Sequence, residues 1–233
     1  MQRRQFTPAL AALMLARTSC ALLLGESATA FALDETEAAS GVRAALERGA
    51  DSAVAMLGKP GGFLDDPRVR IQLPNGLKSA ASMLRAIGQQ QRVDDLVNSM
   101  NRAAESAVPE AKPLLLNAVR AMSVEDAVKI VRGGDTSVTD FFAAKTRVPL
   151  GEKFLPVVTV ETRKVSLAAK YDAVASKGSA FGLVKPEDAN VEQYVTRKAL
   201  DGLFFMIGQE EKKIRADPVA TGSAILKAVF GGH

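Results

Sequence analysis

The chain has 233 residues, which is long enough to bury one core of ordinary size. Apolar residues make up 47% of it and charged residues 24%, and this balance excludes an intrinsically disordered chain. The formal net charge is +4, but without residues 1–32 only 27 basic and 25 acidic residues remain. Because the basic and acidic residues of the remaining chain are nearly equal in number, we expect no nucleic-acid partner.

Residues 1–32 have the layout of a signal peptide, with a basic start, an apolar stretch and a small-residue end. We expect cleavage after Ala32 or, as the alternative, after Ala30. The opening Arg3-Arg4-Gln5-Phe6 has the twin-arginine form, and this route and general secretion both remain open. The sequence therefore predicts an exported protein of the periplasm or cell envelope.

Cys20 is the only cysteine, and two interpretations of it remain open. It is either an apolar residue that is removed with the signal or the site of lipid attachment, although Arg17 stands where a lipoprotein signal has an aliphatic residue. If Cys20 is removed, the mature chain has no disulfide. No later stretch has roughly 18 uninterrupted apolar residues, so we expect no transmembrane span in the mature chain.

A first helix is predicted from Glu35 to Leu57, because apolar residues recur there on one helical face. The glycines and proline of residues 58–62 end it. Between Pro67 and Pro74 the pattern changes to alternation of apolar and polar residues. We therefore expect an extended arm or a short edge strand over residues 63–74.

The rest of the chain returns to helical periodicity and short connections. Apolar residues at helical spacing predict helices over about 77–87, 93–107, 114–122 and 157–180, with a further helix around Phe141. Pro149 and Pro156 are expected to bound or kink the segment between the helix around Phe141 and the helix over 157–180. The expected caps are Ser123 with Asp126, Asp135, Asn190 with Gln193 for a helix over Val191–Ala216, and Asp217 for a last helix.

These elements predict an all-α fold, an irregular multi-helix bundle with one extended arm near residues 63–74. No repeat of about 20–50 residues is present, which argues against a solenoid. Residues 33–233 are expected to form a single helical domain.

Several strings of the sequence resemble an uncharacterised bacterial family, domain of unknown function 4197. They cover nearly all of the expected mature chain and occur in the order of the family. The resemblance implies an exported, mainly helical protein with a secretory or lipoprotein signal, and it implies no activity. The strings are Gly61–Leu64, Asp66–Ile71, Met100–Glu105, Val108–Pro113 and Tyr194–Phe204, followed by Glu210–Lys212 and Ile214–Arg215.

Common catalytic machinery is missing from the expected mature fold. The only histidine is His233, the last residue, and it is more simply a chain end than a catalyst. Without histidine or cysteine inside the fold, Ser-His and Cys-His pairs and the usual zinc sites are excluded. We therefore expect no catalytic residues, no metal site and no cofactor.

Asp201 is the sharpest candidate for a ligand site. It interrupts the apolar run 199–207, whose composition predicts a helix inside the bundle. A buried carboxylate requires a partner, and Arg197 lies one helical turn away. Asn101, Arg102 and Glu105 form a second polar face that could meet this pair. A buried ion pair that fixes helix register is the structural alternative.

The leading functional hypothesis is a non-enzymatic envelope protein that binds a small amphipathic molecule or an envelope protein partner between its helices. One alternative is a carboxylate-dependent metal-binding protein or hydrolase. A purely structural role is the other alternative. The carboxylates considered for the first alternative are Asp65, Asp66, Glu105, Glu110 and Asp201.

Overall fold

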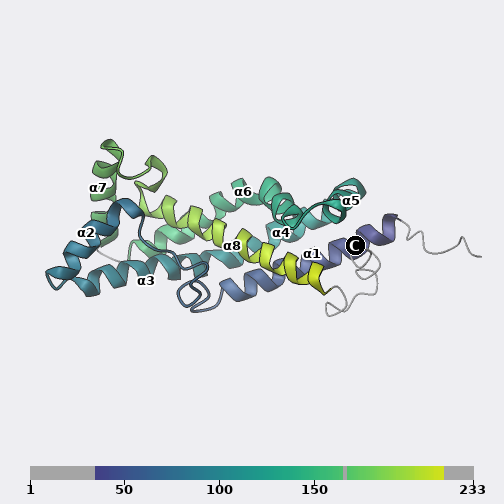
Figure 1. The fold of residues 1–233 in the computed structure, drawn as a ribbon, viewed down its shortest axis with the longest axis horizontal. Helices are drawn as coiled ribbons and strands as arrows, with labels where there is room; N and C mark the ends of the chain where they lie inside the picture. Colours follow the sequence, from purple (N-terminus) through teal and green to yellow (C-terminus); the bar gives the residue numbers. More distant parts are fainter. Residues whose placement is uncertain (1–34, 165–166, 218–233) are drawn as a thin grey trace, which may run out of the picture. The chain divides into compact units, whose positions relative to one another are not determined.

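The computed structural model describes residues 35–164 and 167–217, except for the side chains of residues 35–38 and 167. Every regular element within those ranges is a helix, which confirms the predicted all-α class (Figure 1). The predictions on the signal peptide and on a last helix after Asp217 lie outside the described residues. The α-helices are α1 (Glu35–Leu57), α2 (Asn75–Ala86), α3 (Gln90–Ala107), α4 (Ala111–Arg120), α5 (Val124–Arg132), α6 (Ser137–Thr162), α7 (Leu167–Ala180) and α8 (Val191–Ala216), and the 3-10 helices are η1 (Val108–Glu110) and η2 (Pro186–Asp188).

Helices α3, α6 and α8 form the centre of the bundle and run alongside one another (Figure 1). On one part of this centre α1 packs against α4, α5 and α8, and on another α2 and α7 pack against α3. The predicted bounds of α1 and α8 agree with the structure, and the apolar periodicity used to predict them corresponds to their buried faces. Across residues 35–164 and 167–217, no helix is both long and apolar enough to cross a membrane.

Helix α6 continues through Pro149 and Pro156, which we expected to bound or kink it. Proline removes an amide and leaves the carbonyl four residues earlier without its helical donor. Those carbonyls belong to Lys145 and Glu152, whose exposure allows water to satisfy them. The opposite face carries a buried stripe at four-residue spacing, and this packing holds the helix together. The stripe is Phe142, Thr146, Leu150, Phe154, Val158 and Thr162.

The helix caps agree with the sequence in two cases and differ in a third. Ser123 and Asp126 form the predicted capping box of α5, and the Asn190 side chain accepts a hydrogen bond from the amide of Gln193 at the start of α8. The expected cap of α6 by Asp135 is wrong. The N-terminus of α6 is capped instead by the carboxylate of Glu211, from α8.

Residues 63–74 contain no regular strand and are extended only from residue 70 on, because residues 63–64 and 67–69 form turns, but the alternation predicted between Pro67 and Pro74 is confirmed for residues 68–72. Val69 and Ile71 are buried, whereas Arg68, Arg70 and Gln72 are exposed. The segment crosses the surface of α3 and α8 without a neighbouring strand. Besides its own backbone turns, the segment is held by hydrogen bonds to side chains of those two helices, and this arrangement places one wall of the candidate site.

Candidate functional site

A groove of about 730 Å³ lies beside the N-terminal half of α8. Residues 68–76 form one wall, residues 183–185 and Asp188 of the α7–α8 connection form another, and α8 forms the floor. Two further hollows described below are smaller, at about 200 Å³ and about 20 Å³.

The groove is strongly basic although the chain as a whole is nearly balanced. It contains six cationic side chains and only two carboxylates, Asp188 and Asp201. Four of the six cations lie within 4.0 Å of a carboxylate, which leaves two of them open to an anion. The cations are Arg68, Arg70, Lys78, Lys185, Arg197 and Lys198.

Two of the cations have no partner among the residues that the structure describes. The side chains of Arg70 and Lys78 form neither a hydrogen bond nor an ion pair there, and both residues are exposed. Arg68 differs, because its guanidinium lies 2.6 Å from the Asp66 carboxylate. Their hydrogen bond lowers the pKa of Asp66 below its ordinary value. Arg70 and Lys78 are therefore the cations that are most open to a bound anion.

Asn101 and Glu105 hold the wall of the groove from behind. The Asn101 amide accepts from the Ile71 amide at 2.8 Å and donates to the Ile71 carbonyl at 2.9 Å, as a neighbouring strand would. One turn along α3, Glu105 accepts hydrogen bonds from the amides of Phe63 and Leu64, both at 3.1 Å. Both side chains are buried, so these bonds satisfy backbone groups that water does not reach.

The same segment is fixed to α8 by an aromatic ring and a hydroxyl. The Phe63 ring is fully buried and lies so close to Gly202 that an added Cβ there would approach it to 2.6 Å. The Tyr194 hydroxyl donates to the Gln72 carbonyl at 2.6 Å. Burial raises the pKa of Tyr194 to about 12, so at neutral pH this hydroxyl keeps the proton that it donates.

Arg197 joins the floor of the groove to the α7–α8 connection. Its guanidinium donates to the Asp188 carboxylate and lies 5.5 Å from the centre of the Tyr194 ring. The Asp188 carbonyl accepts a hydrogen bond from the Tyr171 hydroxyl at 2.9 Å. Burial raises the pKa of Tyr171, which stays protonated. Both walls are thus held in place before any ligand is bound.

Asp201 is not buried, and this part of the prediction is wrong. Its side chain is 40% exposed, because residues 68–76 and 183–188 do not cover this side of α8. Its nearest cation is Arg147 of α6 at 3.0 Å, while Arg197 lies 3.9 Å away and has Asp188 as its closer partner. The second polar face does not meet the pair either. Arg102 pairs with Glu105 at 3.0 Å, behind the groove wall.

Two of the five predicted site residues therefore line the groove, and the other three lie behind its wall. Asp201 and Arg197 line the groove. Asn101 and Glu105 support the backbone of its wall, and Arg102 pairs with Glu105.

The start of α2 adds a partial positive charge to the groove. Pro74 occupies the N-cap position and no side chain caps the helix. Pro74, Asn75 and Gly76 all line the groove, so the first amides of α2 lie at its edge. Uncapped amides and the helix dipole both favour an anion there.

An apolar cavity of about 200 Å³ adjoins the groove. It lies between α2, α3 and α7 and is lined by Leu77, Leu84, Leu96 and other apolar side chains, with Arg92 and Lys170 as its only charged residues. Leu73 lines both the cavity and the groove, and a basic surface and an apolar one therefore meet at this residue.

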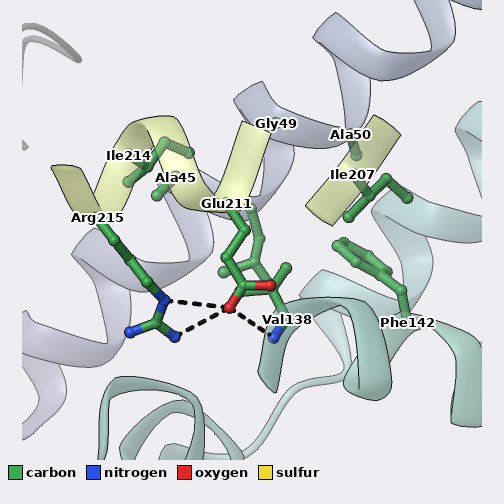
Figure 2. A pocket seen from close by; sticks show the side chains of 10 residues that line it. Ala45, Gly49, Ala50, Val138, Phe142, Ile207, Glu211, Ile214 and Arg215 are labelled. Atoms are coloured by element: carbon green, nitrogen blue, oxygen red, sulfur yellow. Dashed lines mark hydrogen bonds and ion pairs between the residues drawn. The ribbon is translucent and has the colours of Figure 1, made fainter. Parts of the chain in front are cut away.

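A third hollow surrounds Glu211, but at about 20 Å³ it has room only for a water molecule (Figure 2). The buried Glu211 carboxylate accepts hydrogen bonds from the amides of Val138 and Thr139 and from the guanidinium of Arg215. Figure 2 shows Glu211 reaching from α8 to the start of α6. All of these bonds are internal, so we assign Glu211 to the stability of the fold.

The carboxylates considered for metal binding are not brought together. No group of three potential ligands occurs among residues 35–164 and 167–217. Asp66 is paired with Arg68, Glu105 with Arg102 and Asp201 with Arg147.

The sequence contains a signal for part of the basic groove, although Arg197 is the only one of its cations that was predicted as a site residue. Arg68 and Arg70 are exposed between the buried Val69 and Ile71, and both line the groove. No comparable local signal points to Lys78, Lys185 or Lys198, because only the folded chain brings them to that face.

The comparisons with known proteins add a family but no activity. The family model described as "Protein of unknown function (DUF4197)" matches residues 32–231. No curated protein and no solved structure matches the chain.

Proposed function

Since the chain belongs to the DUF4197 family, whose description names no activity, we propose from the geometry of the groove that the protein binds an anionic amphiphile without transforming it. Such a molecule has a phosphate or carboxylate headgroup on a hydrocarbon chain. The observation that carries the proposal is that one large groove is lined by six cations, two of which, Arg70 and Lys78, have no partner among the described residues.

The headgroup is proposed to lie between Arg70, Lys78 and the start of α2. These two side chains have no other partner among the described residues, and uncapped amides lie beside them. Cationic side chains and helix N-terminal amides together favour an anionic group.

The hydrocarbon chain is proposed to follow the apolar part of the groove towards Leu73 and the adjoining cavity. Phe205 lines the groove and is 40% exposed, so its ring is accessible to a hydrocarbon chain. Ligand sites of this kind are mostly apolar, with a few polar groups that orient the ligand.

Binding rather than catalysis is proposed because the groove offers no suitable base or nucleophile. Its carboxylates are paired with arginines, and the hydroxyl of Tyr194 is occupied by the Gln72 carbonyl. General acid–base catalysis requires a group whose pKa lies near the working pH, and the raised pKa of Tyr194 is far from it. The metal-dependent alternative and an envelope protein partner have no comparable contact in their favour.

Calorimetric titration with dodecyl phosphate below its micelle concentration would test the proposal. We expect saturable binding with one site per chain, and no binding of dodecyltrimethylammonium, which carries the opposite charge. The double variant Arg70→Gln/Lys78→Gln should bind about tenfold more weakly, because two charge-assisted contacts are lost.

The matched control is Lys145→Gln/Lys153→Gln, which removes the same charge from exposed positions on α6. We expect it to bind as the unmodified protein does. Equal weakening of both double variants would show that only net charge matters and would refute a site in the groove.

We also propose that the protein is exported to the periplasm or cell envelope through the signal at residues 1–32. N-terminal sequencing of the protein accumulated by its own cells should then begin at Leu33, or at Phe31 for the alternative cleavage. A chain that still begins at Met1 would contradict export by cleavage.

A further inference from the structure

The turn that follows α7 presents two large apolar side chains to solvent. Phe181 is 81% exposed and Leu183 is 70% exposed, with Gly182 between them. We call residues 181–183 the tip. Large apolar residues are normally buried, so two on one short turn indicate a surface that another apolar phase covers.

The tip has a fixed backbone conformation. The amide of Leu183 donates to the Gly178 carbonyl at 2.8 Å and that of Gly182 donates to the Ser179 carbonyl at 3.0 Å. This pair of bonds, with Gly182 at a φ of +71°, is a Schellman motif that ends α7. In such a motif the residue at the position of Leu183 usually packs back onto the helix. Here it meets Gly178, which has no side chain to cover it.

Val184 anchors the tip immediately after it. Its side chain is buried, and an added Cβ at Gly178 would lie only 2.9 Å from its Cγ2. On the other side an added Cβ at Gly76 would lie 2.2 Å from the Leu183 carbonyl oxygen. The close packing against both glycines holds the backbone of the tip, while the side chains of Phe181 and Leu183 stay outside.

Several exposed lysines lie on α7 and directly after the tip. Lys170, Val174, Lys177 and Phe181 follow one another at helical spacing and all are exposed. Lys185 follows the tip with a side chain that is 76% exposed. Apolar side chains with flanking lysines are typical of segments that lie at the interface of an anionic bilayer.

The acidic residues of this region do not cancel that charge. The Asp172 carboxylate accepts a hydrogen bond from the Val191 amide at 2.8 Å, and Asp188 is paired with Arg197. Only Glu187 is exposed, at 4.0 Å from Lys185. The exposed charge beside the tip is therefore mainly positive.

We infer that the tip inserts Phe181 and Leu183 into the surface of an anionic lipid bilayer, with Lys170, Lys177 and Lys185 at the level of the headgroups. This docking surface goes beyond the proposed ligand groove. Leu183 and Lys185 also line the groove, so a docked protein would have the groove open beside the bilayer.

The chain has no tryptophan, which allows a direct test of insertion. Phe181→Trp gives a single probe at the tip, and Val148→Trp gives a matched probe at an exposed apolar position of α6. The protein is purified in the form that its own cells accumulate and is mixed with phosphatidylglycerol vesicles. We expect a blue shift and quenching by brominated acyl chains for the probe at 181 alone. An unshifted, unquenched probe at 181, or equal quenching at 148, would overturn the inference.

Vesicle flotation supplies the second measurement. Phe181→Ser/Leu183→Ser should lower the partition coefficient by about tenfold or more, since burying one such side chain contributes a factor of that order. The control Val148→Ser/Val160→Ser removes two exposed apolar residues of α6 and should partition normally. Equal partitioning of both variants, or equal binding to phosphatidylcholine vesicles, would refute docking through this tip.

The two proposals can fail separately. Arg70→Gln/Lys78→Gln alters the groove and leaves the tip unchanged, so this variant should still float with vesicles. Loss of dodecyl phosphate binding with vesicle binding retained would leave the tip assignment intact.

Discussion

The side-chain amide of Asn101 gives Ile71 the two backbone hydrogen bonds that an adjacent strand would otherwise provide. It also donates to the Val97 carbonyl within its own helix at 2.7 Å. The sequence placed Asn101 and Glu105 on a polar face that was expected to meet Asp201 and Arg197. It could not say what they contact, because their partners are backbone atoms about 30 to 42 residues away.

Replacing Asn101 should therefore destabilise the fold and release the groove wall. Asn101→Ala leaves the amide and the carbonyl of Ile71 buried without partners, which costs about 1–3 kcal/mol for each unsatisfied group. We expect a lower unfolding midpoint in urea and faster hydrogen exchange at the Ile71 amide. Asn98→Ala on the exposed side of the same helix is the control and should change neither. Unaltered exchange at Ile71 in the Asn101 variant would contradict this account.

At the scale of the helices, local signals were sufficient wherever a helix is capped by its own neighbours. Ser123 and Asn190 were both predicted because each cap lies three residues from its partner. For helix α6 the expected boundary at a proline and the expected cap by Asp135 were both wrong. Its prolines suggested interruption, but the buried stripe on the other face keeps it continuous. Its cap, Glu211, lies more than 70 residues further along the chain, where no sequence pattern points to it.

Glu211→Gln should accordingly weaken the attachment of α6 to α8. The change removes the negative charge that accepts the α6 amides, the Ser137 hydroxyl and the Arg215 guanidinium. Buried hydrogen bonds to a charged acceptor contribute about 1.5–3 kcal/mol, so we expect a loss of that order in the free energy of unfolding. Glu152→Gln, at an exposed position of α6, is the control and should have little effect. Equal stability of the two variants in chemical denaturation would refute the capping role.

For the molecule as a whole, the composition does not reveal the basic groove on which the proposed function rests. The 27 basic and 25 acidic residues after residue 32 give no reason to expect that the chain binds anions. The fold separates these charges, gathering six cations in one groove while pairing both of its carboxylates. Net charge is a sum over the chain and contains no information on such local separation. Residues 68–76, most of which belong to the predicted extended arm, and residues 183–188 between α7 and α8 create it.

Salt should therefore weaken ligand binding in a way that the net charge alone would not suggest. Raising NaCl from about 0.05 M to about 0.5 M shortens the screening length from about 14 Å to about 4 Å, so cations that do not contact the headgroup directly attract it less. We expect the affinity for dodecyl phosphate to fall by about tenfold, since its headgroup is attracted by several cations at once. In Arg70→Gln/Lys78→Gln the same change in salt should have a smaller effect, because two of the screened charges are already absent. A salt dependence that is identical in the two proteins would place the anion elsewhere on the surface, even if both still bind it.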